Sequence, residues 1–170
     1  RIHKLHELNQ SLWYDNIQRK LLVNGELEKM IAGGLIRGVT SNPSIFHNAI
    51  AKSSDYDAAL KPMAWAGWST NQIFYQLVIE DIQQAADLFL ELYRQTGGAD
   101  GYVSLEVSPL LASETVASVA EAKRLWKLVD RPNLMVKIPA TKEGIPAIRQ
   151  AIAAGINVNA TLIFSLDRYK

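Results

Sequence analysis

The chain has 170 residues and a formal net charge of +1, and its 48% hydrophobic and 21% charged residues are typical of a globular domain with a buried core. Lys and Arg alternate with Asp and Glu, so no basic run indicates a nucleic-acid or membrane partner. The absence of Cys excludes disulfides and thiolate sites, the three His lack zinc-protease spacing, and no metal or other cofactor is expected. No run is apolar over a membrane-spanning length and no secretory signal opens the sequence, so we expect a reducing cytoplasm.

Short apolar stretches alternate with longer helical patterns, which is typical of parallel α/β proteins. Strands are predicted, in chain order, at 11–15, 37–41, 101–107, 133–138 and 156–163. Helices are predicted from about Asn24, over 43–50, over 56–66, from 69 or 70 to Gly97, from a Ser113 cap to Asp130, over 141–154 and after Ser165. No glycine-rich phosphate turn follows the first strand, so the pattern favours a TIM-type (β/α)8 barrel, of which strands 1–5 are present, over a dinucleotide-binding open sheet.

Both ends of the sequence are typical of positions inside a longer chain. The sequence begins at Arg1 rather than Met and ends at Lys170, a few residues into a new helical pattern without a stop signal. We therefore expect residues 1–170 to form one partial barrel domain, with a helical excursion between the second and third strands and the remaining strands downstream. The missing C-terminal half of the barrel is then an expected partner, because five strands would leave two sheet edges unpaired.

Each predicted strand separates into an apolar set and a polar set, because successive side chains point to opposite faces. In the fifth strand, for example, Val158 and its alternate neighbours are apolar, whereas Asn159 and Thr161 are polar. The outer face of a barrel packs on helices, so the polar sets should point inward, near the C-terminal strand ends where barrel active sites form. The expected interior ring consists of Asp15, Thr40 or Asn42, Glu106, Lys137, and Asn159 with Thr161.

This ring has the groups that Schiff-base chemistry requires. Burial and neighbouring charges can lower the pKa of an interior lysine such as Lys137, and a neutral amine attacks ketones to form an imine. The protonated imine withdraws electrons and allows the bond one carbon further along to break. Asp15 and Glu106 supply one carboxylate for the departing hydroxyl proton and another for the water lost during imine formation. Taken singly, each polar residue could instead be a helix cap or a satisfied buried group.

Five segments contain the predicted strands and the residues of the polar ring: Leu12-Trp-Tyr-Asp-Asn-Ile17, Ile36-Arg-Gly-Val-Thr-Ser-Asn-Pro-Ser-Ile-Phe46, Ser104-Leu-Glu-Val107, Met135-Val-Lys-Ile-Pro-Ala-Thr141 and Ile156-Asn-Val-Asn-Ala-Thr-Leu-Ile-Phe-Ser165. These segments resemble sequence blocks of bacterial transaldolases, in the family's order and over nearly the whole chain. The sequence is most similar to the longer bacterial transaldolases, some of which are fused to a phosphoglucose isomerase.

The resemblance implies a reaction of the pentose phosphate pathway. A dihydroxyacetone unit would pass from sedoheptulose 7-phosphate or fructose 6-phosphate to an aldose phosphate, through a Schiff base on Lys137. Asp15 would take the proton of the substrate's C4 hydroxyl. Glu106, helped by Thr161, would act through a water molecule in forming and hydrolysing the imine.

The resemblance also implies which residues bind substrate. Asn42 and Asn159 would bind the dihydroxyacetone moiety, with Thr40 in support. The family's phosphate-binding Ser and Arg lie on later strands, so the resemblance places them beyond Lys170.

Two alternatives remain at this point. A lysine-dependent aldolase, such as a fructose 6-phosphate aldolase, would use the same ring but release dihydroxyacetone to water; such proteins are shorter, and the long helical stretch before the third strand argues against this. The other alternative is an inactive barrel fragment that serves as a folding or assembly module. An assay with and without an acceptor aldehyde distinguishes the transferase from the lyase.

Overall fold

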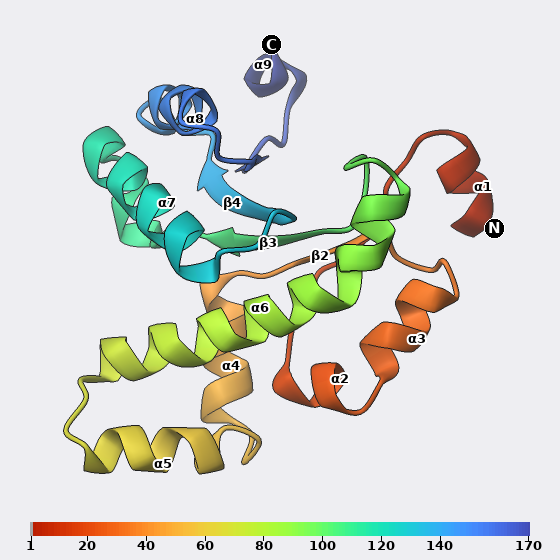
Figure 1. Ribbon diagram of the computed structural model, residues 1–170. Helices are drawn as coiled ribbons and strands as arrows, with labels where there is room; N and C mark the ends of the chain where they lie inside the picture. The colour runs from red at the N-terminus through yellow and green to blue at the C-terminus, as the bar shows by residue number, and fades with distance from the viewer. Residues whose placement is uncertain (1) are drawn as a thin grey trace.

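A computed structural model describes residues 2–170 and contains one sheet (Figure 1). Its strands are β1 (Trp13–Tyr14), β2 (Gly38–Thr40), β3 (Tyr102–Glu106), β4 (Leu134–Pro139) and β5 (Val158–Thr161). All neighbouring strands are parallel, and they lie side by side in chain order. A doubly wound nucleotide-binding sheet would instead place later strands on both sides of the first, so the sheet confirms the expected barrel-type winding.

Helices lie before, between and after these strands along the described chain. They are α1 (Ile2–Glu7), α2 (Arg19–Val23), α3 (Glu26–Ala32), α4 (Pro43–Ala51), α5 (Asp57–Trp65), α6 (Thr70–Gln95), the 3-10 turn η1 (Pro109–Leu111), α7 (Thr115–Val129), α8 (Gly144–Ala153) and α9 (Leu166–Tyr169). Helix α6 packs on β3, α7 on β4, and α8 on β4 and β5. In Figure 1, α5 extends beyond α6 on the side away from the sheet. None of the described helices is long and apolar enough to cross a membrane.

Helix α6 is the longest element, and local sequence sets both of its ends. The hydroxyl of Ser69 accepts the Gln72 N–H, and the Gln72 side chain accepts the Ser69 N–H at 2.8 Å, which is a capping box. At the other end, Gly97 and Gly98 adopt left-handed conformations with φ of 61° and 81°. Helices often end at a residue in the left-handed conformation. Glycine adopts this conformation without strain because it has no Cβ.

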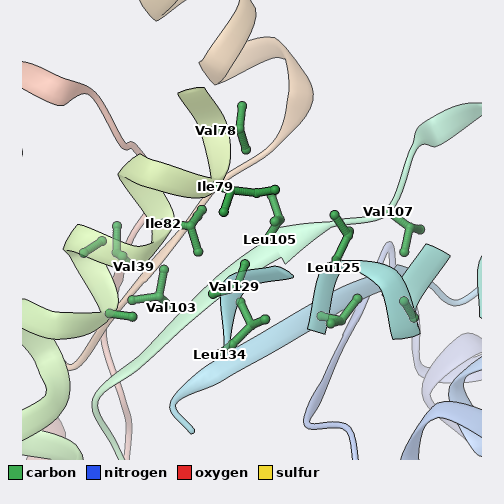
Figure 2. Close-up of a cluster of buried hydrophobic side chains, with 14 of the residues drawn as sticks. Val39, Val78, Ile79, Ile82, Val103, Leu105, Val107, Leu125, Val129 and Leu134 are labelled. Carbon is green, nitrogen blue, oxygen red and sulfur yellow. The ribbon is translucent and has the colours of Figure 1, made fainter. Parts of the chain in front are cut away.

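The core lies between the sheet and its covering helices. The outward side chains of the middle strands are 0–5% exposed. Figure 2 shows Val103 and Leu105 of β3 facing Ile82 of α6, with Leu125 of α7 and Leu134 of β4 beside them. These are the apolar sets that the alternation pattern predicts for the outer face. Because the helices occupy this face, the alternate side chains must point to the opposite, inner face of the sheet.

Several element boundaries differ from the sequence predictions. The strands predicted at 11–15 and 156–163 are shorter, because only Trp13–Tyr14 and Val158–Thr161 are paired with neighbours. The helix expected from about Asn24 is α3, which begins at Glu26 and ends at Ala32. Helix α2, which ends at Val23, is not predicted from the sequence, and Gly25, with a φ of 77°, separates the two helices.

The predicted cap at Ser113 is wrong. Glu114 occupies the N-cap position of α7 and makes no side-chain cap hydrogen bond, since η1 delays the start of the helix. The hydroxyl of Thr115 instead donates to the carbonyl of Glu143 at 2.7 Å. Similarly, α8 begins at Gly144 rather than Thr141, whose hydroxyl accepts the Gly144 N–H at 2.9 Å.

Gly101 controls how closely β3 approaches α6, and this gives a stability prediction. Its φ is +83°, and a Cβ at this position would lie 2.4 Å from the backbone nitrogen of Tyr93. We expect Gly101→Ala to lower the free energy of unfolding by about 1–2 kcal/mol through left-handed strain and by about 1–3 kcal/mol more through overpacking. Urea denaturation measures the loss.

Gly97→Ala is the matched control for this prediction. Gly97 has a φ of +61°, but a Cβ there would meet nothing within 4 Å. This variant should therefore show the strain of about 1–2 kcal/mol alone. Equal losses in the two variants would contradict the close packing of β3 on α6.

Candidate active site

The inner face of the sheet carries a row of polar side chains near the C-terminal strand ends. Glu106 of β3 is in register with Lys137 of β4, and Lys137 is in register with Asn159 of β5. Thr40 of β2 is in register with Ser104, two residues before Glu106 on the same face of β3. Adjacent strands are about 5 Å apart, so these side chains form one continuous polar surface.

Lys137 lies at the centre of this surface. Its Nζ is 3.3 Å from Oε2 of Glu106 and donates to the backbone carbonyl of Ser41 at 3.3 Å. The two side chains are only 12% and 15% exposed. Partial removal of an ammonium group and a carboxylate from water is unfavourable unless the charges are paired and hydrogen-bonded, and here they are. The arrangement therefore holds the amine in one place and keeps a proton acceptor beside it.

Below the ion pair is a layer of hydroxyl groups that bond to one another and to the strands. The Ser104 hydroxyl donates to Oγ1 of Thr40 at 2.7 Å, and the Ser41 hydroxyl donates to the Ser104 carbonyl at 2.8 Å. Ser41 and Ser104 are both buried. Because their hydroxyls have partners, the layer forms a stable floor beneath Lys137 rather than a set of unsatisfied groups.

Asn42 has a structural role at the edge of the site. It is the N-cap of α4: its side-chain oxygen accepts the Ile45 N–H at 2.9 Å, and Pro43 occupies the first helical position. This leaves the amide nitrogen of Asn42 unused by the cap. Asn42 also borders a cavity of about 230 Å³ between the ends of β2 and β3 and the helices α4 and α6. The cavity is lined by Ser41, Asn42, Pro43, Phe46, Asn71, Phe74, Tyr75, Val78, Leu105, Glu106, Ser108, Pro109 and Leu110.

Asp15 and Thr161 lie at the two margins of the polar surface. Asp15 directly follows β1, is exposed, and lies two strands away from Glu106 in the sheet order. Thr161 is the last residue of β5, half-buried, and in register with Pro139. The structure thus brings Glu106, Lys137 and Asn159 together on the adjacent strands β3, β4 and β5. It leaves Asp15, the other carboxylate, just after β1, which is the opposite edge strand of the sheet.

Two relevant residues escape prediction from the sequence. Ser41 contacts Lys137 through its backbone carbonyl, which no side-chain pattern reveals. Asp81 is fully buried on α6 next to the core residues Val78 and Ile82. A carboxylate on the apolar stripe of a helix is a usable signal, because an isolated buried charge is so unfavourable that a partner must exist.

The arrangement is suited to acid–base and nucleophilic chemistry on a carbonyl compound. It combines a primary amine, a carboxylate at 3.3 Å, and nearby amides and hydroxyls that can bind substrate hydroxyl groups. Within the described part of the chain, no three His, Asp or Glu side chains gather as a group that could hold a metal ion.

Comparison with known proteins gives consistent matches along the chain. The sequence profile of the family described as Transaldolase/Fructose-6-phosphate aldolase matches residues 12–170. Proteins named Transaldolase are 45% identical over 166 residues in Trichodesmium erythraeum, 49% over 169 in Thermobifida fusca and 52% over 159 in Thiobacillus denitrificans. These alignments cover 98%, 99% and 94% of this chain, but only 44%, 46% and 44% of the relatives.

The chain therefore spans less than half the length of the curated relatives it matches. Within that span, the profile match includes all five strands of the sheet and each residue of the polar surface. The chain belongs to the transaldolase/fructose-6-phosphate aldolase family.

Proposed function

We propose that the protein is a transaldolase that transfers a dihydroxyacetone unit from sedoheptulose 7-phosphate or fructose 6-phosphate to an aldose phosphate. The observation that supports this most strongly is the partly buried pair of Lys137 and Glu106, 3.3 Å apart on the inner face of the sheet. Family membership supports the same reaction. As an enzyme of sugar phosphate metabolism, it would work in the cytoplasm, in the pentose phosphate pathway.

In the first half of the proposed reaction, Lys137 forms the Schiff base. Its Nζ, as the neutral amine, attacks the C2 carbonyl of the ketose, a C–N bond forms, and the carbonyl oxygen becomes a hydroxyl. That hydroxyl leaves as water after gaining a proton, and the product is an iminium ion. We assign the proton transfers of this step to Glu106, acting through a water molecule with Thr161, because its carboxylate lies 3.3 Å from Nζ and can accept a proton.

In the second half, we assign the proton of the C4 hydroxyl to Asp15. As Asp15 accepts this proton, the C3–C4 bond breaks, and its electrons flow into the iminium to give an enamine on Lys137. The aldose phosphate leaves, an acceptor aldehyde takes its place, and the same steps run in reverse. Separate carboxylates on β3 and after β1 suit two proton transfers at different atoms of the substrate.

We assign the binding of the dihydroxyacetone hydroxyls to Asn42 and Asn159, with Thr40 in support. Asn159 is in register with Lys137, and Asn42 lies at the cavity that Glu106 also lines. The cavity of about 230 Å³ borders Asn42 and Glu106, although Lys137 and Asn159 do not line it. The phosphate group of the substrate would be bound by residues outside 1–170.

Reductive trapping tests the nucleophile. Borohydride with fructose 6-phosphate should add a reduced three-carbon adduct to Lys137 of the full-length protein, detected by peptide mass spectrometry. Lys137→Ala should abolish both the adduct and turnover. The matched control is Lys142→Ala, which changes an exposed lysine and should leave both intact.

Labelling at Lys142 or Lys52 in place of Lys137 would contradict the assignment. The same preparation should also be assayed with and without an acceptor aldose phosphate. Turnover that requires the acceptor supports a transaldolase, whereas equal release of free dihydroxyacetone in its absence would indicate a lyase.

Replacing Asp15 and replacing Glu106 should each slow a different step of the reaction. Asp15→Asn should still allow trapping at Lys137 but slow carbon–carbon cleavage, because only the later proton transfer is lost. Glu106→Gln should slow imine formation itself. Each loss should be about 10²–10⁴-fold, the usual contribution of a positioned acid or base. Single-turnover kinetics with borohydride quenching measures both steps, and failure of both variants at the same step would refute this division.

Asn42 should show separable structural and binding roles. Asn42→Ala should lower the free energy of unfolding by about 1 kcal/mol through loss of the cap. Asn42→Ser keeps a capping oxygen but loses the amide, so it should retain near-normal stability and raise the KM for fructose 6-phosphate about 2–10-fold, the effect of one hydrogen bond. Urea denaturation and steady-state kinetics give the two values. A normal KM in the Ser variant would mean that Asn42 is only a cap.

A further inference from the structure

A buried polar cluster lies away from the amine, where α2, α5 and α6 meet. We define the Asp81 cluster as Arg19, Tyr56, Glu80 and Asp81. Nε of Arg19 donates to Oδ1 of Asp81 at 2.8 Å, and the hydroxyl of Tyr56 donates to Oδ2 of Asp81 at 2.7 Å. The second nitrogen of the guanidinium pairs with Glu80 at 3.0 Å.

The Asp81 cluster is buried, so its charged groups must stay paired and hydrogen-bonded to one another. The side chain of Asp81 is fully buried and that of Arg19 is 14% exposed. Burial raises the pKa of Asp81, and the hydrogen bonds from Tyr56 and Arg19 oppose this effect. The pKa of Tyr56 is also raised, by burial and then by the Asp81 charge, so its hydroxyl keeps the proton that it donates. Removing one partner of a buried ion pair is strongly destabilising, because the remaining charge is left buried without a partner. One of the best supported roles of such a pair is to select one conformation of the protein over others.

The cluster also holds the backbone between β1 and α2. The N–H of Arg19 itself donates to the Tyr56 hydroxyl at 3.1 Å, so the contact fixes the main chain as well as the side chain. Two residues earlier, Ile17 is 1% exposed within the core. On the other side, Tyr14 is paired with Val39 in the sheet. The short segment between these anchors contains Asp15.

Asp15 depends on these anchors because its own side chain is exposed. Packing around an exposed carboxylate does little to define its position, so the position must come from the backbone. We propose that Arg19, Tyr56 and Asp81 are positioning residues that hold the β1–α2 segment so that Asp15 reaches the substrate hydroxyl. This inference rests on the proposed function, in which Asp15 takes the C4 proton.

The inference predicts a step-specific defect. A displacement of a catalytic group by about 1 Å can slow its step by about 10²-fold. Asp15 acts only after the imine has formed, so disturbing the Asp81 cluster should slow cleavage and leave Schiff-base formation at Lys137 almost unchanged. Simple loss of folded protein would reduce both steps by the same factor.

The test uses Tyr56→Phe and Asp81→Asn in the full-length protein. Tyr56→Phe keeps the buried ring and the direct Arg19–Asp81 pair, and removes only the hydroxyl that links the Arg19 backbone N–H to Asp81. This variant therefore tests the inference even if Asp81→Asn does not fold. The matched control is Asp87→Asn. Asp87 is also on α6 and pairs with an arginine, Arg131, at 2.6 Å, but Arg131 precedes β4, at the opposite end of the strands from Asp15.

We expect cleavage of fructose 6-phosphate in single turnover to slow about 10–100-fold in Tyr56→Phe. Borohydride trapping at Lys137 in Tyr56→Phe should stay within about twofold of the protein without substitutions. The control Asp87→Asn should behave like the protein without substitutions in both the cleavage and the trapping assay. Amide hydrogen exchange of residues 15–19 should accelerate in Tyr56→Phe and not in the control, which reports the loss of the anchor independently of activity.

Two outcomes would overturn the inference. One is a folded Tyr56→Phe variant with normal cleavage. The other is an equal reduction of trapping and cleavage, which would indicate a purely structural cluster. If the unmodified protein itself forms no adduct at Lys137, the proposed function fails first, and the two failures are therefore distinguishable.

Discussion

The alternation of side chains along parallel strands is the constraint on which the rest of this structure depends. Helices α6, α7 and α8 cover one face of the sheet, so that face must be apolar, and Val103, Leu105 and Val136 fill it. The residues between them are forced to the opposite face. In-register pairing then places Glu106 beside Lys137, two residues that are 31 positions apart in the chain. The polar site is thus a direct consequence of how the apolar core is built.

That placement raises an electrostatic problem, which the neighbouring strands solve. An amine pointing to the inner face loses water, and Lys137 recovers part of the lost solvation from the Glu106 carboxylate and the Ser41 carbonyl. The hydroxyls of Ser104 and Thr40 satisfy each other beneath it. The same contacts that make burial tolerable give the amine a fixed position and a nearby proton acceptor, which is what a Schiff-base mechanism requires.

Features encoded by local periodicity are predictable from the sequence, and features that depend on distant partners are not. The alternation of apolar and polar residues within each strand correctly predicted the outer and inner faces of the sheet. The alternation of strands and helices along the chain correctly predicted that the strands are parallel. Helix α7 instead begins after the turn η1, with Glu114 at its N-cap. The residues next to Ser113 in the sequence do not reveal that Ser113 is not the cap. The partner of Asp81 is Arg19, 62 positions earlier, and only the folded chain brings them together. The carbonyl of Ser41 carries no side-chain signal at all.

The central claim is that the amine on the inner face, held by Glu106, is the group that bonds to substrate. A crystal structure of the full-length protein after reduction with fructose 6-phosphate and borohydride tests this most directly. The account predicts continuous density from Nζ of Lys137 to a three-carbon unit, with its hydroxyls facing Asn159 and Asn42. An unmodified Lys137 still paired with Glu106, together with an adduct on another lysine, would contradict it.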